Sequence, residues 1–140
     1  MNTMNINEAD EKEFTKLIAD DLESGALEKV IELFRYNKTL FLVVGNLLKD
    51  DRMKVRLGAN MLIDELREEK PDDVKLALER VLPLLQDQSP TIRGDAADML
   101  GMIGSAEHIG LLQELLEDSN HQVVEIATDA IDLINENNLS

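Results

Sequence analysis

The chain of 140 residues has no cysteine and no tryptophan, and aromatic residues make up only 3% of it. The absence of cysteine excludes disulfides, thiolate metal sites and a cysteine nucleophile. An interior with so few aromatics must be filled by Leu, Ile, Val, Ala and Met, which suits closely packed helices better than a β-sandwich. The composition therefore favours an all-α domain that is large enough to bury a core.

Long apolar stretches are also missing. The longest, residues 40–48, is interrupted by Gly45 and Asn46, and it is much shorter than the roughly 18 residues that cross a bilayer. Residues 1–10 lack the basic region and the apolar segment of a signal peptide. These features predict a soluble, cytoplasmic protein that does not bind a membrane.

Positive charge is scarce, and it is absent from the last third of the chain. The formal net charge is -15, Arg93 is the last Arg or Lys, and ten acidic residues follow it. Such a surface repels phosphate backbones and anionic lipid headgroups, which argues against a nucleic-acid partner for this half. A solvated acidic face that keeps the protein soluble explains the same pattern equally well.

What the sequence does contain is a three-fold internal repeat over residues 47–66, 84–103 and 115–134. Each copy opens with Leu-Leu-x-Asp, followed at fixed spacing by a β-branched residue, an Ala and two large apolar residues. The copies begin 37 and then 31 residues apart, and the six extra residues fall around residues 67–72. A period of about 30–40 residues indicates a stacked array in which insertions are placed in loops between the repeats.

Each copy predicts a hairpin of two antiparallel helices, because apolar residues recur at helical spacing on both sides of the Asp. The expected helices cover residues 37–49 and 53–68, 73–86 and 90–103, and 107–117 and 121–135. In the second copy Ser89 is expected to cap a helix that begins at Pro90 and ends at a left-handed Gly104. The repeated Ala (Ala59, Ala96 and Ala127) is expected where two helices cross closely.

The first 36 residues do not follow the repeat. They show two helical patterns, residues 8–23 and 26–36, separated by Ser24 and Gly25 with Ser24 as a plausible N-cap. A stacked array needs end units with a polar outer face, so we expect this hairpin to cap the array. The predicted organisation is one domain over residues 1–140, with the cap at 8–36, repeats at 37–69, 73–104 and 107–136, and disordered residues 1–7 and 136–140.

The pattern Leu-Leu-x-Asp-x-x-x-x-Val-Arg-x-x-Ala-x-x-x-Leu-x-x-Ile resembles the HEAT repeat, and more narrowly the short HEAT-like repeats named after phycobilisome lyases. The match is carried by Leu84, Leu85, Asp87, Pro90, Ile92, Arg93, Ala96, Leu100, Ile103 and Gly104 in the second copy, and by Leu47, Leu48, Asp50, Val55, Arg56, Ala59 and Leu66 in the first. The resemblance implies a right-handed superhelical solenoid with the second helix of each hairpin on the concave side. It also implies that the Asp braces the turn and that the Arg contacts Asp residues of successive repeats. The third copy has Val124 in place of the Arg.

If the second helices line a concave face, the residues on them outside the core form the candidate binding surface. These residues are mainly acidic, and positions three or four apart share one helix face. The candidate partner-binding residues are Asp64, Glu68, Asp95, Asp98, Glu125, Asp129 and Asp132, with Met61, Gly101 and Glu136 at aligned or flanking positions. This pattern predicts a non-enzymatic scaffold or adaptor that binds a basic or polar segment of a partner protein.

No motif indicates a catalytic, metal or cofactor site. The sequence has no EF-hand spacing and no phosphate-binding loop, and its two histidines, His108 and His121, do not form a repeated metal-binding pattern. Two alternatives to the scaffold remain at this point. One is tetrapyrrole handling or a lyase subunit, which the narrower resemblance implies; the other is a structural subunit of a complex, for which an exposed apolar groove beside the acidic residues would be the sign.

Overall fold

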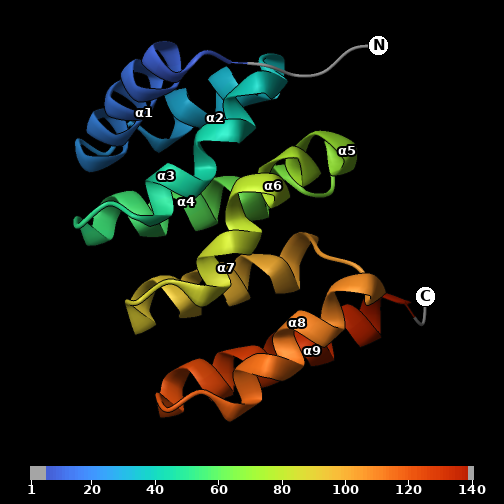
Figure 1. Cartoon of the computed structure of the whole chain (residues 1–140). Coiled ribbons are helices and arrows are strands. Elements are labelled where there is room, and N and C mark those ends of the chain that lie inside the picture. Colours follow the sequence, from blue (N-terminus) through green and yellow to red (C-terminus); the bar gives the residue numbers. More distant parts are fainter. Residues whose placement is uncertain (1–5, 139–140) are drawn as a thin grey trace. The chain divides into compact units, whose positions relative to one another are not determined.

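The computed structural model describes residues 6–138, and every regular element within them is a helix (Figure 1). The chain divides into two compact units, Met1–Arg80 and Val81–Ser140. The boundary lies inside the first helix of the second repeat. The all-α fold expected from the composition and the repeat is confirmed.

The N-terminal unit begins with an antiparallel hairpin of α1 (Glu8–Glu23) and α2 (Leu27–Tyr36). The first repeat follows as η1 (Lys38–Val43), α3 (Val44–Leu48) and α4 (Met53–Leu66), and then come α5 (Pro71–Val74), η2 (Lys75–Ala77) and α6 (Leu78–Val81). The core includes Phe34 of α2 and Phe41 of η1, whose rings meet edge to face with their centroids 5.0 Å apart. Edge-to-face ring pairs stabilise a core beyond the effect of the apolar area that they bury.

The C-terminal unit contains η3 (Leu82–Gln86), α7 (Pro90–Ile103), η4 (Ala106–His108), α8 (Ile109–Glu114), η5 (Leu115–Glu117) and α9 (His121–Asn138). Its core is aliphatic, with Met99, Leu100 and Leu112 completely buried. The second helix of each repeat, α4, α7 or α9, is a regular α-helix. The repeated Ala is fully buried in all three copies, as the repeat predicts (Ala59, Ala96 and Ala127).

The first helix of each repeat is broken into short α and 3-10 segments, whereas the sequence predicted continuous helices over residues 37–49, 73–86 and 107–117. In the second copy Pro83 lies inside the predicted helix, where it has no N–H to donate to the preceding turn. Over stretches of five or six residues, the three- and four-residue spacings of apolar side chains fit a 3-10 helix as well as an α-helix. The expected positions are therefore right and the expected helix type is wrong.

Two expectations about helix ends need correction. Ser24 does not cap the second helix; it ends α1, and Gly25 at φ 90° closes the turn with bonds from the Gly25 and Ala26 N–H groups to the carbonyls of Leu22 (3.2 Å) and Asp21 (2.8 Å). Gly104 is not left-handed, since its φ is -80°. It is needed for space instead, because a Cβ there would lie 2.5 Å from the Leu100 carbonyl oxygen.

The expected disorder at residues 7 and 136–138 is also wrong. Asn7 caps α1, with its side-chain oxygen accepting the Asp10 N–H at 2.8 Å, and residues 136–138 continue α9. Residues 1–5 and 139–140 lie outside the described part of the chain. The cap of α7 is confirmed, since Ser89 accepts the Ile92 N–H and Pro90 is the first helical residue.

Candidate protein-binding surface

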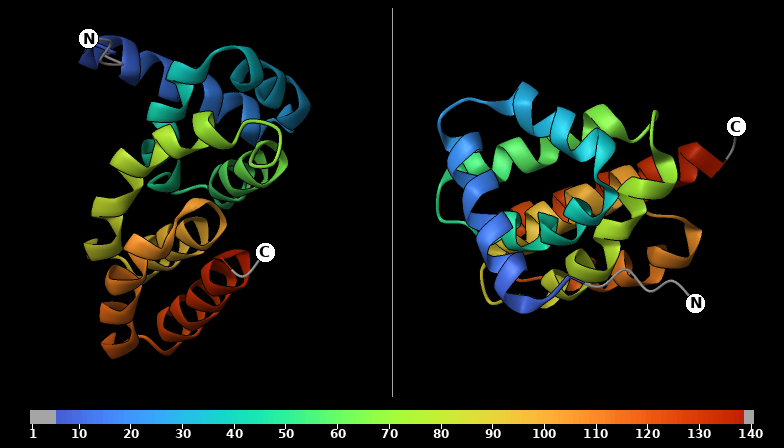
Figure 2. Two further views of the ribbon diagram at one scale, coloured as in Figure 1. Left: turned by 90° about the vertical axis from the view of Figure 1, so that its right-hand side faces the viewer. Right: turned by 90° about the horizontal axis from the view of Figure 1, so that it is seen from above.

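Helices α7 and α9 pack side by side (Figures 1 and 2). A Cβ at Gly101 would lie 2.9 Å from both Cα and Cβ of Ala130, so the two backbones approach as closely as a glycine allows. At Gly94 a Cβ would lie 3.1 Å from the tip of the Ile126 side chain. Gly101 was expected on the binding surface, and this expectation is wrong because the residue is buried in the helix contact.

The packing leaves acidic residues on the solvent sides of both helices. On α7, Asp98 is exposed and Asp95 is half-buried. On α9, Glu125, Asp129 and Asp132 are all exposed, and their spacing of four and three residues places them on one helix face. We call these five residues the acidic face. Five of the seven candidate residues thus lie on two helices that pack side by side.

The other two candidates, Asp64 and Glu68, belong to the N-terminal unit. Asp64 is exposed near the end of α4, and its carboxylate accepts from Arg67 Nε at 3.0 Å. Glu68 is exposed in the turn that follows α4. Among the flanking residues, Met61 is exposed, as expected, at 47%, and Glu136 is exposed on α9.

The repeated Asp has the same structural role in all three copies. Its side chain accepts the backbone N–H of the residue two positions later, which closes the turn between the two helices of the repeat. The three bonds run from Arg52 to Asp50 (2.9 Å), from Ser89 to Asp87 (2.9 Å) and from Asn120 to Asp118 (2.8 Å). These residues are part of the scaffold, and the expected bracing of the turn is confirmed.

The repeated Arg also belongs to the scaffold. Arg93 donates to the carbonyls of Asp87 (2.9 Å) and Gln88 (3.1 Å) in its own turn, and to both carboxylate oxygens of Asp118 in the next repeat (2.8 and 3.0 Å). The guanidinium group of Arg93 lowers the pKa of Asp118 below its ordinary value, with help from the Asn120 N–H. Arg56 donates to the carbonyls of its own turn in the same way.

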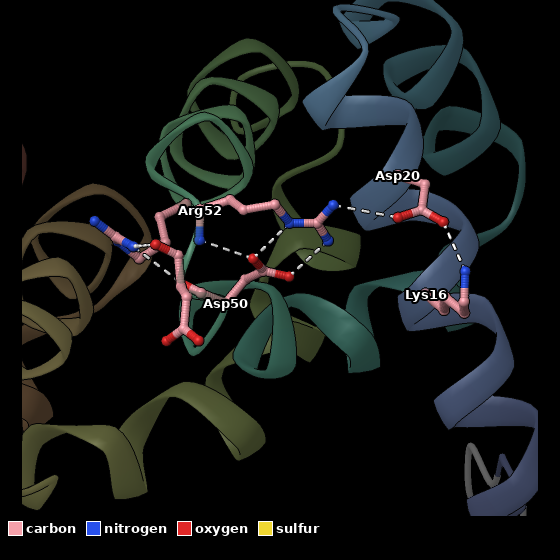
Figure 3. A network of polar contacts seen from close by, with 6 residues as sticks. Lys16, Asp20, Asp50 and Arg52 are labelled. Atoms are coloured by element: carbon pink, nitrogen blue, oxygen red, sulfur yellow. Dashed lines mark hydrogen bonds and ion pairs between the residues drawn. The ribbon is translucent and has the colours of Figure 1, made fainter.

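A second arginine of the first repeat, Arg52, was not singled out by the sequence pattern. It lies between two carboxylates (Figure 3): its guanidinium donates to Asp50 at 2.9 and 3.0 Å and to Asp20 of α1 at 3.3 Å. Lys16 donates to the other oxygen of Asp20 at 2.9 Å. Hydrogen bonds from Lys16 and Arg52 lower the pKa of Asp20, and Arg52 lowers that of Asp50. The network ties the N-terminal hairpin to the first repeat.

The two histidines do not form a site. His108 Nδ1 accepts the Ser105 N–H at 3.0 Å and so helps to cap η4, of which His108 is the last residue. His121 is exposed at the start of α9, as expected. Within residues 6–138 no three His, Asp or Glu side chains are grouped so as to hold a metal ion. In the same part of the chain no helix combines the length and the apolar character needed to cross a membrane.

An apolar groove in the N-terminal unit was not predicted. Phe14 and Leu17 of α1 are 39% and 56% exposed, and Leu33 of α2 is 39% exposed. They line a cavity of about 770 Å³ together with residues of η1. The sequence carries no signal for it, because the spacing of residues 14, 17, 18 and 22 is that of an ordinary buried helix face.

A family model for HEAT repeats matches residues 41–132, which is more than half of the chain. The chain belongs to the HEAT-repeat family. The match covers the three repeats whose turns are braced by Asp, and it begins after the N-terminal hairpin of α1 and α2. No curated protein and no solved structure matched the chain. The fold is therefore an all-α helical-repeat solenoid of the HEAT type.

Proposed function

We propose that this HEAT-repeat protein is a non-enzymatic scaffold or adaptor that binds a basic or polar segment of a partner protein at the acidic face of α7 and α9. HEAT repeats commonly mediate protein–protein interaction, and the regular second helices offer a rigid surface for it. The observation that carries the proposal is the row of exposed carboxylates Glu125, Asp129 and Asp132 on α9, together with the exposed Asp98 on the helix packed against it.

The charge balance of the C-terminal unit supports this choice. Residues 81–140 contain 11 acidic residues and one basic residue, Arg93, which is engaged with the turn and with Asp118. A surface with so much charge of one sign attracts segments of the opposite sign over distances near the Debye length, about 8 Å at physiological salt. Such attraction raises the association rate and selects against acidic partners.

The proposal is tested by reversing charge on the acidic face. The variant Asp129→Lys with Asp132→Lys changes two fully exposed residues, and the control Glu114→Lys with Glu117→Lys makes the same charge change on the first helix of the same repeat. Affinity capture from the native cells, quantified against the unaltered chain, is the measurement. We expect a partner that dissociates as salt is raised and that is lost with the first variant and retained by the control.

Equal capture by all three proteins, at unchanged helix content and melting temperature, would contradict the proposal. Loss with both variants would show that the overall charge of the unit, rather than the acidic face, retains the partner. The same capture tests the structural-subunit alternative, which expects a stable complex that survives high salt.

Tetrapyrrole handling, which the resemblance to phycobilisome-lyase repeats implies, is the less supported alternative. His108 would be the half-buried candidate for an axial ligand, but its Nδ1 accepts the Ser105 N–H. Ligation through Nδ1 would displace this bond, and ligation through Nε2 would put the ring proton on Nδ1, so either would remove the helix cap. Mixing the purified protein with haem or a bilin separates the two functions, because the scaffold proposal expects no change in the absorption spectrum of the pigment.

A further inference from the structure

The apolar groove of the N-terminal unit is lined by residues from three elements, α1, α2 and η1. Phe14, Leu17 and Ile18 line it from α1, Leu33 from α2 and Leu40 from η1. Exposed apolar side chains that occur singly are normal on protein surfaces, but several gathered from three elements around one hollow mark an interaction site.

Leu17 is the most exposed of the apolar side chains that line the groove, at 56%, although Ile18 and Leu22 on the same helix are buried. Covering such a side chain with a partner lowers the free energy of the complex in proportion to the apolar area that is removed from water. The groove therefore favours an occupant with an apolar face.

Carboxylates mark both ends of this groove along α1. Asp10 lies near the first turn of the helix, and Asp20 and Asp21 lie near its last turn. The one basic residue of the groove lining, Lys29, pairs with Asp21 at 3.3 Å. The surrounding hairpin, residues 8–36, has nine acidic and four basic residues. Asp20 is also engaged, by Lys16 and Arg52. The excess of acidic residues around the groove therefore favours an occupant that carries a basic residue at the end that meets Asp10.

We propose that the groove binds an amphipathic helix of a partner protein, with apolar residues at i, i+3 or i+4 and i+7 and a Lys or Arg near the end that meets Asp10. An apolar groove lined by helices is a surface that receives the apolar face of such a helix. This site is independent of the acidic face of α7 and α9.

The test uses the full chain and a synthetic peptide of about 14 residues, with leucines along one helical face and two lysines at each end. Two matched peptides replace the leucines by serine or the lysines by glutamate. Binding is followed in ¹H–¹⁵N correlation spectra of the protein. We expect saturable shifts in the amides of Phe14, Leu17 and Leu33 with the first peptide, and weaker binding of both matched peptides.

A variant pair localises the contact. Leu17→Asn removes an apolar side chain from the groove, whereas Tyr36→Asn removes one that is 74% exposed on α2 and does not line the groove. Both positions are exposed enough for the fold to tolerate the change, which melting curves verify. We expect Leu17→Asn to weaken binding at least about tenfold, the loss of affinity that follows from losing part of one buried leucine, and Tyr36→Asn to leave it unchanged.

Four results would overturn the proposal. They are the absence of saturable binding, shifts confined to α7 and α9, equal binding of the serine peptide, and equal binding of the glutamate peptide. Shifts of the groove amides that grow with protein concentration in the absence of peptide would assign the groove to a second copy of this chain instead. Shifts confined to the acidic face would support the proposed function while refuting the groove, so the two proposals fail separately.

Discussion

The two units of the molecule contrast in charge and in aromatic content. Residues 1–80 carry 13 basic and 18 acidic residues, and residues 81–140 carry one and 11. Every aromatic residue of the chain lies in the first unit, at positions 14, 34, 36 and 41. Both units are built from helical hairpins. They differ in the side chains that fill the core and in the side chains that are exposed to solvent.

The N-terminal unit neutralises many of its own carboxylates. Arg35 donates to Glu69 at 2.7 Å and lowers its pKa, and Arg80 pairs with Glu11 across the unit. Its distinctive surface is instead the apolar groove of α1 and α2. The C-terminal unit has one arginine, and its distinctive surface is acidic. The two proposals therefore predict partners that are selected by different forces: binding at the acidic face should weaken with salt, and binding in the groove should weaken much less.

The aromatic core of the first unit gives the largest expected effect. Phe34 is completely buried and meets Phe41 edge to face, so Phe34→Ala leaves a cavity and removes the ring contact. We expect the free energy of unfolding to fall by about 3–5 kcal/mol, measured by urea denaturation of the full chain. Hydrogen exchange should accelerate in α2 and η1.

Tyr36 offers the matched control, since it lies two residues later on the same helix and is 74% exposed. Tyr36→Ala should change the free energy of unfolding by no more than about 0.5 kcal/mol. If both variants lost the same free energy of unfolding, the Phe34–Phe41 contact would not be what stabilises the N-terminal unit. The contrast between an aromatic and an aliphatic core would then have no energetic consequence.

Glycines within the second helices give the next largest effect, and they differ between the units. A Cβ at Gly101 of α7 would lie 2.9 Å from the Cα of Ala130, which is backbone that cannot move alone. A Cβ at Gly58 of α4 would lie 2.9 Å from the tip of the Leu22 side chain, which can rotate. We expect Gly101→Ala to cost about 1–3 kcal/mol.

For Gly58→Ala the helix propensity gained, about 1 kcal/mol, offsets most of the crowding. The free energies of unfolding of both variants, measured by urea denaturation, are compared with that of the unaltered chain. A Gly101→Ala variant as stable as Gly58→Ala would contradict the close approach of α7 and α9.

The repeat pattern predicted the fold because it records which positions are buried. The repeated Ala, the turn Asp and the Ser89 cap each have a local cause that depends on neighbours within one hairpin, and each was found as expected. The repeat pattern did not predict the helix type of the first helices, because short apolar runs fit the periods of both the α-helix and the 3-10 helix. The pattern also does not show the effect of Pro83, which has no N–H to donate. Gly104 shows the same limit, since its role depends on the packing of Leu100.

The candidate surface was predictable only in part. Exposure of Glu125, Asp129 and Asp132 follows from their phase on a single helix, so the sequence was sufficient. Gly101 shares the aligned position of Asp132, yet it is buried because another helix packs on that side of α7. The groove was missed for a related reason, since periodicity identifies an apolar face but not whether the chain has an element to cover it.

The arginines near the repeat turns are expected to have a smaller effect on stability. Their ion pairs differ between the two units in how deeply they are buried. The side chains of Arg93 and Asp118 are only 16% and 9% exposed, whereas those of Arg52 and Asp20 are 40% and 48% exposed. Hydrogen bonds between charged groups stabilise more when water is excluded from them. We expect Arg93→Ala to lower the free energy of unfolding by about 1–2 kcal/mol and Arg52→Ala to lower it less, both measured by urea denaturation at low and high salt. A larger loss for Arg52→Ala would reverse this ranking.

The contribution of the Arg93–Asp118 pair should also depend on pH in a definite direction. Because Arg93 lowers the pKa of Asp118 in the folded protein, the pair stabilises the fold at pH values above the ordinary Asp pKa of about 3.9, and this stabilisation is lost as the pH falls through the lowered value. Asp118→Asn removes the charge but keeps an oxygen that can accept the Asn120 N–H. The difference in free energy of unfolding between Asp118→Asn and the unaltered chain should therefore be present at pH 7, shrink as the pH falls below about 4, and disappear once the pH is below the lowered pKa of Asp118. A difference that persists at low pH would mean that Asp118 acts through the shape of the turn rather than through its charge.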